Sequence, residues 1–166
     1  MGFWSAAPAS NIAPQTDIND VGSGRPAWFV FQMSRSRLFL ISGSLGAAGV
    51  VLGALGAHGL HDQLLQRQAT GIWQTAVLYH LVHTVALLAL ASQNGGGSAR
   101  LPAATAGAAA CWAGGILLFS GSLYALALGA PRALGPVTPA GGVLLLAGWV
   151  LVAIGGLGRP PESNPP

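Results

Sequence analysis

Four long apolar runs dominate the chain, and short polar or glycine-rich segments separate them. The runs cover residues 38–57, 72–92, 102–128 and 137–157. Each holds roughly the 20 residues that an α-helix needs to cross the hydrocarbon core of a bilayer. The pattern therefore predicts an all-α integral membrane protein, a four-helix bundle with short loops.

The two ends of the chain have a different pattern. Residues 1–34 mix prolines with Asn, Asp, Ser and Gln and show no helical or strand period, and residues 159–166 are rich in proline. Such segments bury too little apolar surface to offset their ordering entropy. We expect disordered tails around a membrane domain at residues 35–158. Met33 stands just before the first run and could serve as an alternative translation start, so residues 1–32 are either a genuine extension or lie outside the mature chain.

The composition supports a membrane location and narrows the function. Charged residues make up 7% of the chain and hydrophobic residues 52%, whereas a typical globular protein is about 25% charged. All seven basic residues are arginines, placed singly or as one close pair near the ends of the apolar runs. A nucleic-acid-binding protein gathers its basic residues on one face, so we expect a lipid bilayer and no nucleic acid as the environment of this chain.

The arginines also predict an orientation. Four spans place both termini on one side of the membrane, and that side receives five of the seven arginines. Because cytoplasmic segments carry the excess of arginine and lysine, we expect both termini in the cytoplasm. Only two arginines fall on the opposite side, and these are Arg67 and Arg132.

Small residues recur at helical spacing in three of the runs. In the first run they follow Ser42 at intervals of 4, 3, 4 and 3, and in the third and fourth runs glycines repeat every seven residues. Such spacing places small residues on one helix face, where membrane helices can approach closely. We therefore predict packing roles for Gly46, Gly49, Gly53, Gly56, Gly107, Gly114, Gly121, Gly141 and Gly148.

Two histidines interrupt the second run near its midpoint, where ionisable side chains are costly and mark functional sites. His80 and His83 are three residues apart, so they share a helix face, with Thr84 beside them. Another histidine ends the first run, and the third run carries a hydroxyl and a phenol. The sequence thus predicts a shared polar centre made of His58, His80, His83, Thr84, Ser120 and Tyr124.

The polar centre has two interpretations. In the favoured one, neutral imidazoles form hydrogen bonds across the bundle and the role is structural. In the other, His80 and His83 bind haem or a metal, or handle protons. A zinc site needs three or four ligands, and Asp62 is the only acid near a run. We therefore expect no metal, no cofactor and no catalytic residues, with haem or metal at the histidine pair as the open alternative.

Four motifs occur in a characteristic order. They are Gly-Ala-Leu-Gly-Ala-His-Gly-Leu at residues 53–60, Tyr-His-Leu-Val-His at 79–83, Leu-Phe-Ser-Gly-Ser-Leu-Tyr at 118–124 and Thr-Pro-Ala-Gly-Gly at 138–142. In these motifs the chain resembles the family of small four-span membrane proteins that includes transmembrane protein 256 and its bacterial relatives. The resemblance covers residues 37–157. It implies a bacterial inner-membrane or mitochondrial-type protein and supplies no reaction, substrate or cofactor.

Two classes of function follow from these patterns. Glycine-rich faces, short loops and the lack of a large domain outside the membrane favour a non-enzymatic accessory or assembly subunit that packs against a larger membrane complex. The alternative is a small proton-linked transporter or channel, or a haem- or metal-binding module, that uses His80 and His83.

Overall fold

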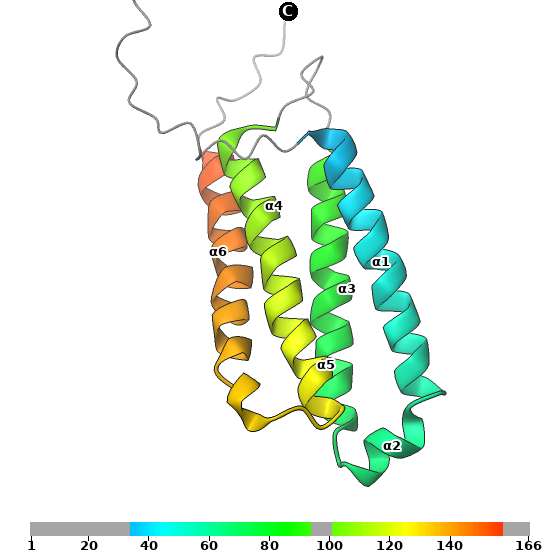
Figure 1. The fold of residues 1–166 in the computed structure, drawn as a ribbon. Helices are drawn as coiled ribbons and strands as arrows, with labels where there is room; N and C mark the ends of the chain where they lie inside the picture. The colour runs from blue at the N-terminus through cyan, green and yellow to red at the C-terminus, as the bar shows by residue number, and fades with distance from the viewer. Residues whose placement is uncertain (1–33, 94–100, 158–166) are drawn as a thin grey trace, which may run out of the picture. The chain divides into compact units, whose positions relative to one another are not determined.

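The computed structural model describes residues 34–93 and 101–157, and these residues are almost wholly helical. The predicted disordered tails lie outside the described residues. Figure 1 shows the order of the elements, which is α1 (Arg35–Ala57), α2 (His61–Gln66), α3 (Thr70–Ser92), α4 (Ala103–Gly115), the π-helix η3 (Ile116–Ser120), α5 (Gly121–Ala127), the 3-10 helix η4 (Arg132–Leu134) and α6 (Val137–Leu157).

Four helical segments are long and apolar enough to cross a membrane, which confirms the predicted fold class. They are α1, α3, the continuous stretch formed by α4, η3 and α5, and the segment that ends in α6. The helices begin and end within three residues of the predicted runs. The membrane domain is therefore a four-helix bundle in which α1 begins on the side where α6 ends (Figure 1).

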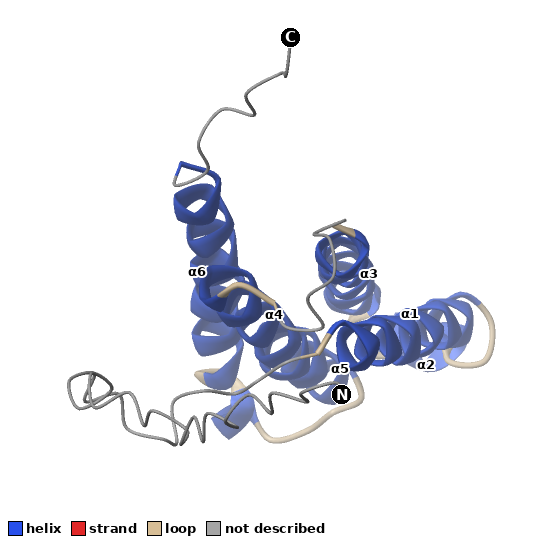
Figure 2. Ribbon diagram, turned by 90° about the horizontal axis from the view of Figure 1, so that it is seen from above, coloured by secondary structure: helices blue, strands red, loops and turns tan. Residues whose placement is uncertain are grey.

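The helices pack as two pairs joined through α3. Helix α1 packs along α3, and α6 packs along α4 and η3, while α3 also contacts α4, η3 and α5. Viewed from above, the order is α1, α3, α4 and α6 (Figure 2). No extensive packing joins α1 to α6 within the described residues. These two helices therefore form the edges of the bundle.

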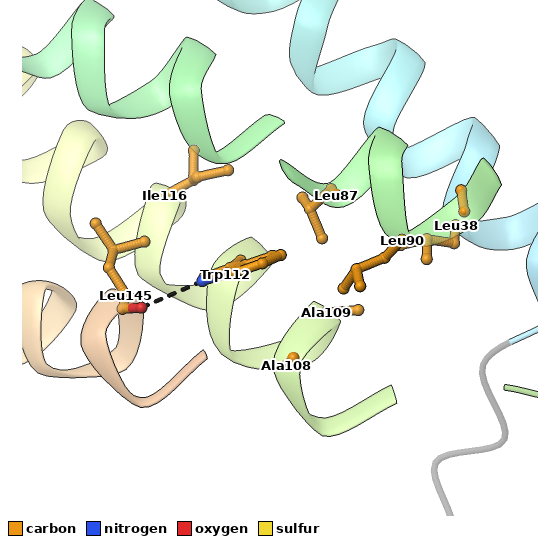
Figure 3. Packing of buried hydrophobic residues seen from close by; sticks show 9 residues of the cluster. Leu38, Leu87, Leu90, Ala108, Ala109, Trp112, Ile116 and Leu145 are labelled. Atoms are coloured by element: carbon orange, nitrogen blue, oxygen red, sulfur yellow. Dashed lines mark hydrogen bonds between the residues drawn. The ribbon is translucent and has the colours of Figure 1, made fainter. Parts of the chain in front are cut away.

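Two apolar clusters hold the pairs together. The larger one surrounds Trp112, whose indole N–H donates a hydrogen bond to the carbonyl oxygen of Leu145 at 3.2 Å (Figure 3). Its other buried members come from α1, α3, α4 and η3, and they are Leu38, Leu87, Leu90, Ala91, Ala108, Ala109 and Ile116. The smaller cluster lies towards α2 and consists of Leu64, Ala69, Trp73, Ala76, Tyr124 and Ala127.

The glycines of α1 lie on the face that contacts α3. A Cβ atom added at Gly49 would lie 2.6 Å from the Cδ2 atom of Leu81, and one added at Gly56 would overlap the indole of Trp73. Added Cβ atoms at Gly46 and Gly53 would be at ordinary contact distances from side chains of α3. The lack of side chains on this face is what brings α3 close to α1.

The glycines of the second pair lie mostly between α4 and α6. Gly107 and Gly114 face leucines of α6, and a Cβ atom at Gly148 would overlap the indole of Trp112. Gly121 does not have the packing role that its spacing predicts. Among the described residues, nothing lies within 4 Å of a Cβ atom added there. The seven-residue repeat fails at this position because the π-helix just before it changes the rotation of the chain.

The π-helix is the feature of the third span that hydrophobic periodicity did not predict. Within it the N–H of Gly121 donates to the carbonyl oxygen of Ile116, one residue further back than in an α-helix. A Cβ atom at Gly141 of α6 would lie 2.8 Å from the carbonyl carbon of Leu118 and from the Cα atom of Phe119. The widened turn is therefore the point where the backbones of the third and fourth spans touch. Single π-turns inside helices occur frequently at functional sites.

Candidate functional site

Five of the six predicted polar-centre residues lie buried between the helices. His80, His83 and Thr84 of α3 are each 5% exposed, Ser120 at the end of η3 is fully buried, and Tyr124 of α5 is 9% exposed. Ser120 and Tyr124 are one helical turn apart, so they share a face of their span. The structure thus places a row of polar groups in an otherwise apolar interior.

His83 uses both of its ring nitrogens. Its Nδ1 atom lies 2.8 Å from the carbonyl oxygen of Tyr79, and the indole Nε1–H of Trp149 donates to its Nε2 atom at 3.2 Å. An indole N–H can only donate, so Nε2 accepts and the ring proton is on Nδ1, which donates to the carbonyl. His83 is therefore a neutral imidazole that links α3 to α6.

The surroundings of His83 are aromatic. The indoles of Trp112 and Trp149 meet its ring edge to face, at centroid distances of 6.2 Å and 6.1 Å. The ring of Tyr79 stacks on it at 5.9 Å. The predicted polar centre does not include Trp149. Its partner lies 66 residues away in the chain, a distance over which periodicity carries no signal.

His80 points to different helices from those that His83 contacts. Its Nδ1 atom lies 3.4 Å from the hydroxyl oxygen of Tyr124, and its Cδ2 atom would lie 3.4 Å from a Cβ added at Gly49 of α1. The ring also lies beside the backbone of Leu45. Its Nε2 atom is buried and has no hydrogen-bond partner among residues 34–93 and 101–157. Because a buried unpaired polar atom destabilises a fold, this atom is a candidate for a functional contact.

The hydroxyl groups divide into satisfied and unsatisfied ones. Thr84 donates to the carbonyl oxygen of His80 at 2.8 Å. Ser122 donates to the carbonyl oxygen of Phe119 at 3.0 Å and lies 2.7 Å from the hydroxyl of Thr138 on α6. The hydroxyl of Ser120 has no hydrogen-bond partner in the part of the chain that the structure describes. Ser122 was outside the predicted site, and its hydroxyl-rich motif was the only sequence signal for it.

His58 lies outside the polar centre, so its assignment to that centre was wrong. It is the C-cap of α1 and is exposed at the end of the bundle, where the chain turns into α2. His61 begins α2 and is exposed as well. The physical reason is depth: α1 ends at Ala57, while His80 and His83 lie almost halfway along α3.

The cluster offers little to a metal ion. Among residues 34–93 and 101–157, no group of three or more His, Cys, Asp or Glu side chains is placed to hold one. His80 and His83 also turn towards different helices, and the second already has both nitrogens engaged. The arrangement is suited to hydrogen bonding between helices. The Nε2 atom of His80 and the hydroxyl of Ser120 are the two buried polar atoms of this cluster without a described hydrogen-bond partner.

The fold and this cluster define a small four-span integral membrane protein with polar groups in its interior. A family profile described as "Protein of unknown function (DUF423)" matches residues 52–142. A UPF0382 membrane protein of Staphylococcus epidermidis is 40% identical over 124 residues, which cover 71% of this chain and 93% of the relative. The chain belongs to this family of uncharacterised membrane proteins, and the resemblance seen in its motifs is confirmed.

Other relatives come from a second bacterium and from a yeast. The UPF0382 membrane protein YwdK of Bacillus subtilis is 36% identical over 121 residues, covering 71% of this chain and 94% of the relative. A UPF0382 membrane protein of Schizosaccharomyces pombe is 33% identical over 119 residues, covering 66% of this chain and 92% of the relative. No solved structure matches the chain. The relatives' names record a membrane location and no activity.

Proposed function

We propose that this protein is a non-enzymatic accessory or assembly subunit that packs against a larger complex in the bacterial inner membrane. The observation that carries the proposal is the low burial of the two edge helices, α1 and α6. In the apolar window of each edge span only 17% of the residues are buried, against 39% in each of the two central spans. Each edge helix contacts the rest of the domain on one side and keeps its other side for lipid or a partner.

The interior supports a structural role. The hydrogen bonds of His83 and Ser122 join α3 and α5 to α6, and the indole of Trp73 joins α3 to the carbonyl oxygen of Leu52 on α1 at 3.0 Å. Polar groups that bind one another across helices hold a bundle in one arrangement. A rigid bundle with free edges is suited to hold a neighbouring membrane protein.

The outer face of α1 is the surface to which we assign this contact. Gly43, Ala47 and Ala54 are exposed on this face, and nothing lies within 4 Å of a Cβ added at Gly43. In lipid, close approach between helices depends on small residues of this kind. A partner helix can therefore approach this face closely at Gly43, Ala47 and Ala54.

Site-specific photo-crosslinking in native membranes tests this proposal. A crosslinker at Ala47, halfway along α1, is expected to capture one protein in stoichiometric yield, and the same protein is expected to co-purify with the intact chain in mild detergent. The matched control is Val82 of α3, which is 48% exposed at a similar depth. The substitution Ala47→Phe is expected to abolish co-purification, and Val82→Phe to preserve it.

Three results would contradict the proposal. They are a lone monomer in mild detergent together with no crosslink at Ala47, equal crosslinking at Ala47 and Val82, and crosslinks only to a second copy of the same chain. The last result would assign the face to self-association instead.

The orientation is part of the same proposal, with both termini in the cytoplasm. Of the described arginines, Arg35 and Arg37 begin α1 on the side where α6 ends, and Arg67 and Arg132 lie on the other side. The described arginines are therefore divided equally between the two sides, so the proposed orientation depends on the remaining arginines of the sequence. A fluorescent-protein fusion at the C-terminus is expected to fluoresce, and a periplasmic phosphatase fusion there to be inactive. The reverse pattern would refute the orientation.

The alternative function is a small proton-linked transporter or channel. It is favoured by the two buried polar atoms without partners, the Nε2 atom of His80 and the hydroxyl oxygen of Ser120, which belong to facing spans. In proteoliposomes this alternative predicts a pH-dependent proton flux that His80→Asn abolishes and Trp149→Phe preserves. An absence of flux with the unsubstituted protein would eliminate it. The haem and metal alternatives have less support, because His83 is already engaged on both nitrogens.

A further inference from the structure

A cleft lies at the end of the bundle where α3 and α6 end and α4 begins. Its volume is about 290 Å³, close to the lower limit of about 300 Å³ for small-molecule sites. Of the described residues that line it, most are leucine, valine, alanine, proline or glycine, and none belongs to α1. Its lining includes Leu90, Gln93, Thr105, Val152, Gly155 and Gly156.

The cleft is at the depth where acyl chains meet lipid headgroups. Helix α3 has 23 residues, so at about 1.5 Å per residue it is slightly longer than the hydrocarbon core, which is about 30 Å thick. Its last residues therefore reach the headgroup level. Leu90 lies in that last turn and Gln93 directly follows the helix. The apolar wall thus faces the outer part of one leaflet, and the polar rim lies at its surface.

A cation is held at the rim of this cleft. The guanidinium of Arg35, at the start of α1, donates a hydrogen bond to the backbone carbonyl oxygen of Gln93, which is itself a lining residue. Asp62 is the only acidic residue in the described part of the chain, and it belongs to α2 at the opposite end of the bundle. No described carboxylate therefore competes for the charge of Arg35.

We propose that this cleft is a binding site for one anionic phospholipid, with an acyl chain in the apolar cleft and the phosphate at Arg35. The cation at headgroup level and the apolar wall beneath it match the two halves of such a lipid. An arginine near the membrane surface attracts an anionic lipid by about 1 kcal/mol, which corresponds to roughly a fivefold preference over a neutral lipid.

Native mass spectrometry of the purified full-length chain tests this site. The protein is exchanged into detergent with equal amounts of phosphatidylglycerol and phosphatidylcholine, and the lipids that stay bound are counted. We expect one retained lipid per chain and about a fivefold preference for phosphatidylglycerol. Arg35→Gln is expected to keep the lipid and lose the preference, whereas Arg37→Gln is expected to keep both.

Filling the cleft separates its role from that of the charge. Among the described residues nothing lies within 4 Å of a Cβ added at Gly156, which lines the cleft, so Gly156→Phe can place its ring there without forcing the described helices apart. This variant is expected to lose the retained lipid. Gly43→Phe is the matched control, since its added Cβ also meets nothing within 4 Å and it lies on the outer face of α1. It is expected to bind lipid as the unsubstituted chain does.

The proposal is overturned if the unsubstituted chain retains no lipid, if its preference is below twofold, or if Gly156→Phe and Gly43→Phe bind lipid equally. Displacement of phosphatidylglycerol by inorganic phosphate alone would also overturn it, because the acyl chain would then contribute nothing. If circular dichroism shows that Gly156→Phe is unfolded, Gly156→Leu replaces it and the same criteria apply.

Discussion

The contact between Gly141 and the π-helix is the point where a single methyl group should matter most. In Gly141→Ala, the new Cβ would lie 2.8 Å from the carbonyl carbon of Leu118 and from the Cα atom of Phe119, and closer still to the backbone nitrogen of Phe119. All of these atoms belong to the backbone, so no side chain can rotate away. The clash can be relieved only by moving α6 away from η3.

The neighbouring residue provides a matched control. In Gly142→Ala the added Cβ would lie 3.6 Å and 3.8 Å from ring carbons of Phe119, which are ordinary contact distances. Overpacking costs about 1–3 kcal/mol, and replacing a helical glycine by alanine recovers up to about 1 kcal/mol. We expect Gly141→Ala to be destabilised by about 1–2 kcal/mol. Gly142→Ala should be neutral or slightly stabilised.

Reversible unfolding in mixed micelles measures this difference. Each purified variant is titrated with a denaturing detergent, and helix content is followed by circular dichroism to give the free energy of unfolding. The two variants have the same composition and differ by one position, so differences in helix propensity largely cancel. Equal stability of Gly141→Ala and Gly142→Ala would refute the assignment of backbone contact between α6 and η3.

Three further predictions use the same titration. Ser120→Ala removes a buried hydroxyl without a described partner, so the free energy of unfolding should stay the same or rise. Ser122→Ala removes a hydroxyl bonded across to α6 and should lower the free energy of unfolding by about 1 kcal/mol. A greater loss of stability in Ser120→Ala than in Ser122→Ala would contradict the hydrogen-bond assignment. Trp149→Phe deletes the donor to His83 and should lower the free energy of unfolding by about 0.5–1.5 kcal/mol. Nitrogen NMR of the same variant should show a changed imidazole signal for His83. An unchanged signal would disprove the hydrogen bond. Gly121→Ala should stabilise the span by up to about 1 kcal/mol, since its Cβ meets nothing, and a loss of stability would contradict its open position.

The candidate site was predictable in part from the sequence. His80, His83 and Thr84 follow from helical spacing within one apolar run, and the structure buries all three. His58 was wrongly included: it ends its run, whereas His80 and His83 lie near the middle of theirs, and the shared motifs do not compensate for that difference in depth. The partner of His83 was not predictable either, since Trp149 meets it through the packing of α6 beside α3.

Four spans could be predicted from the apolar runs alone, because the length of each run is a local property and a bilayer imposes one helix on each run. Residue spacing also placed the small residues of α1 on one face. By contrast, the edge positions of α1 and α6, the widened turn of η3 at Gly141 and the bond between Trp149 and His83 emerge only when the helices pack together. These features depend on how neighbouring helices cross and align, and hydrophobic periodicity carries no information about either.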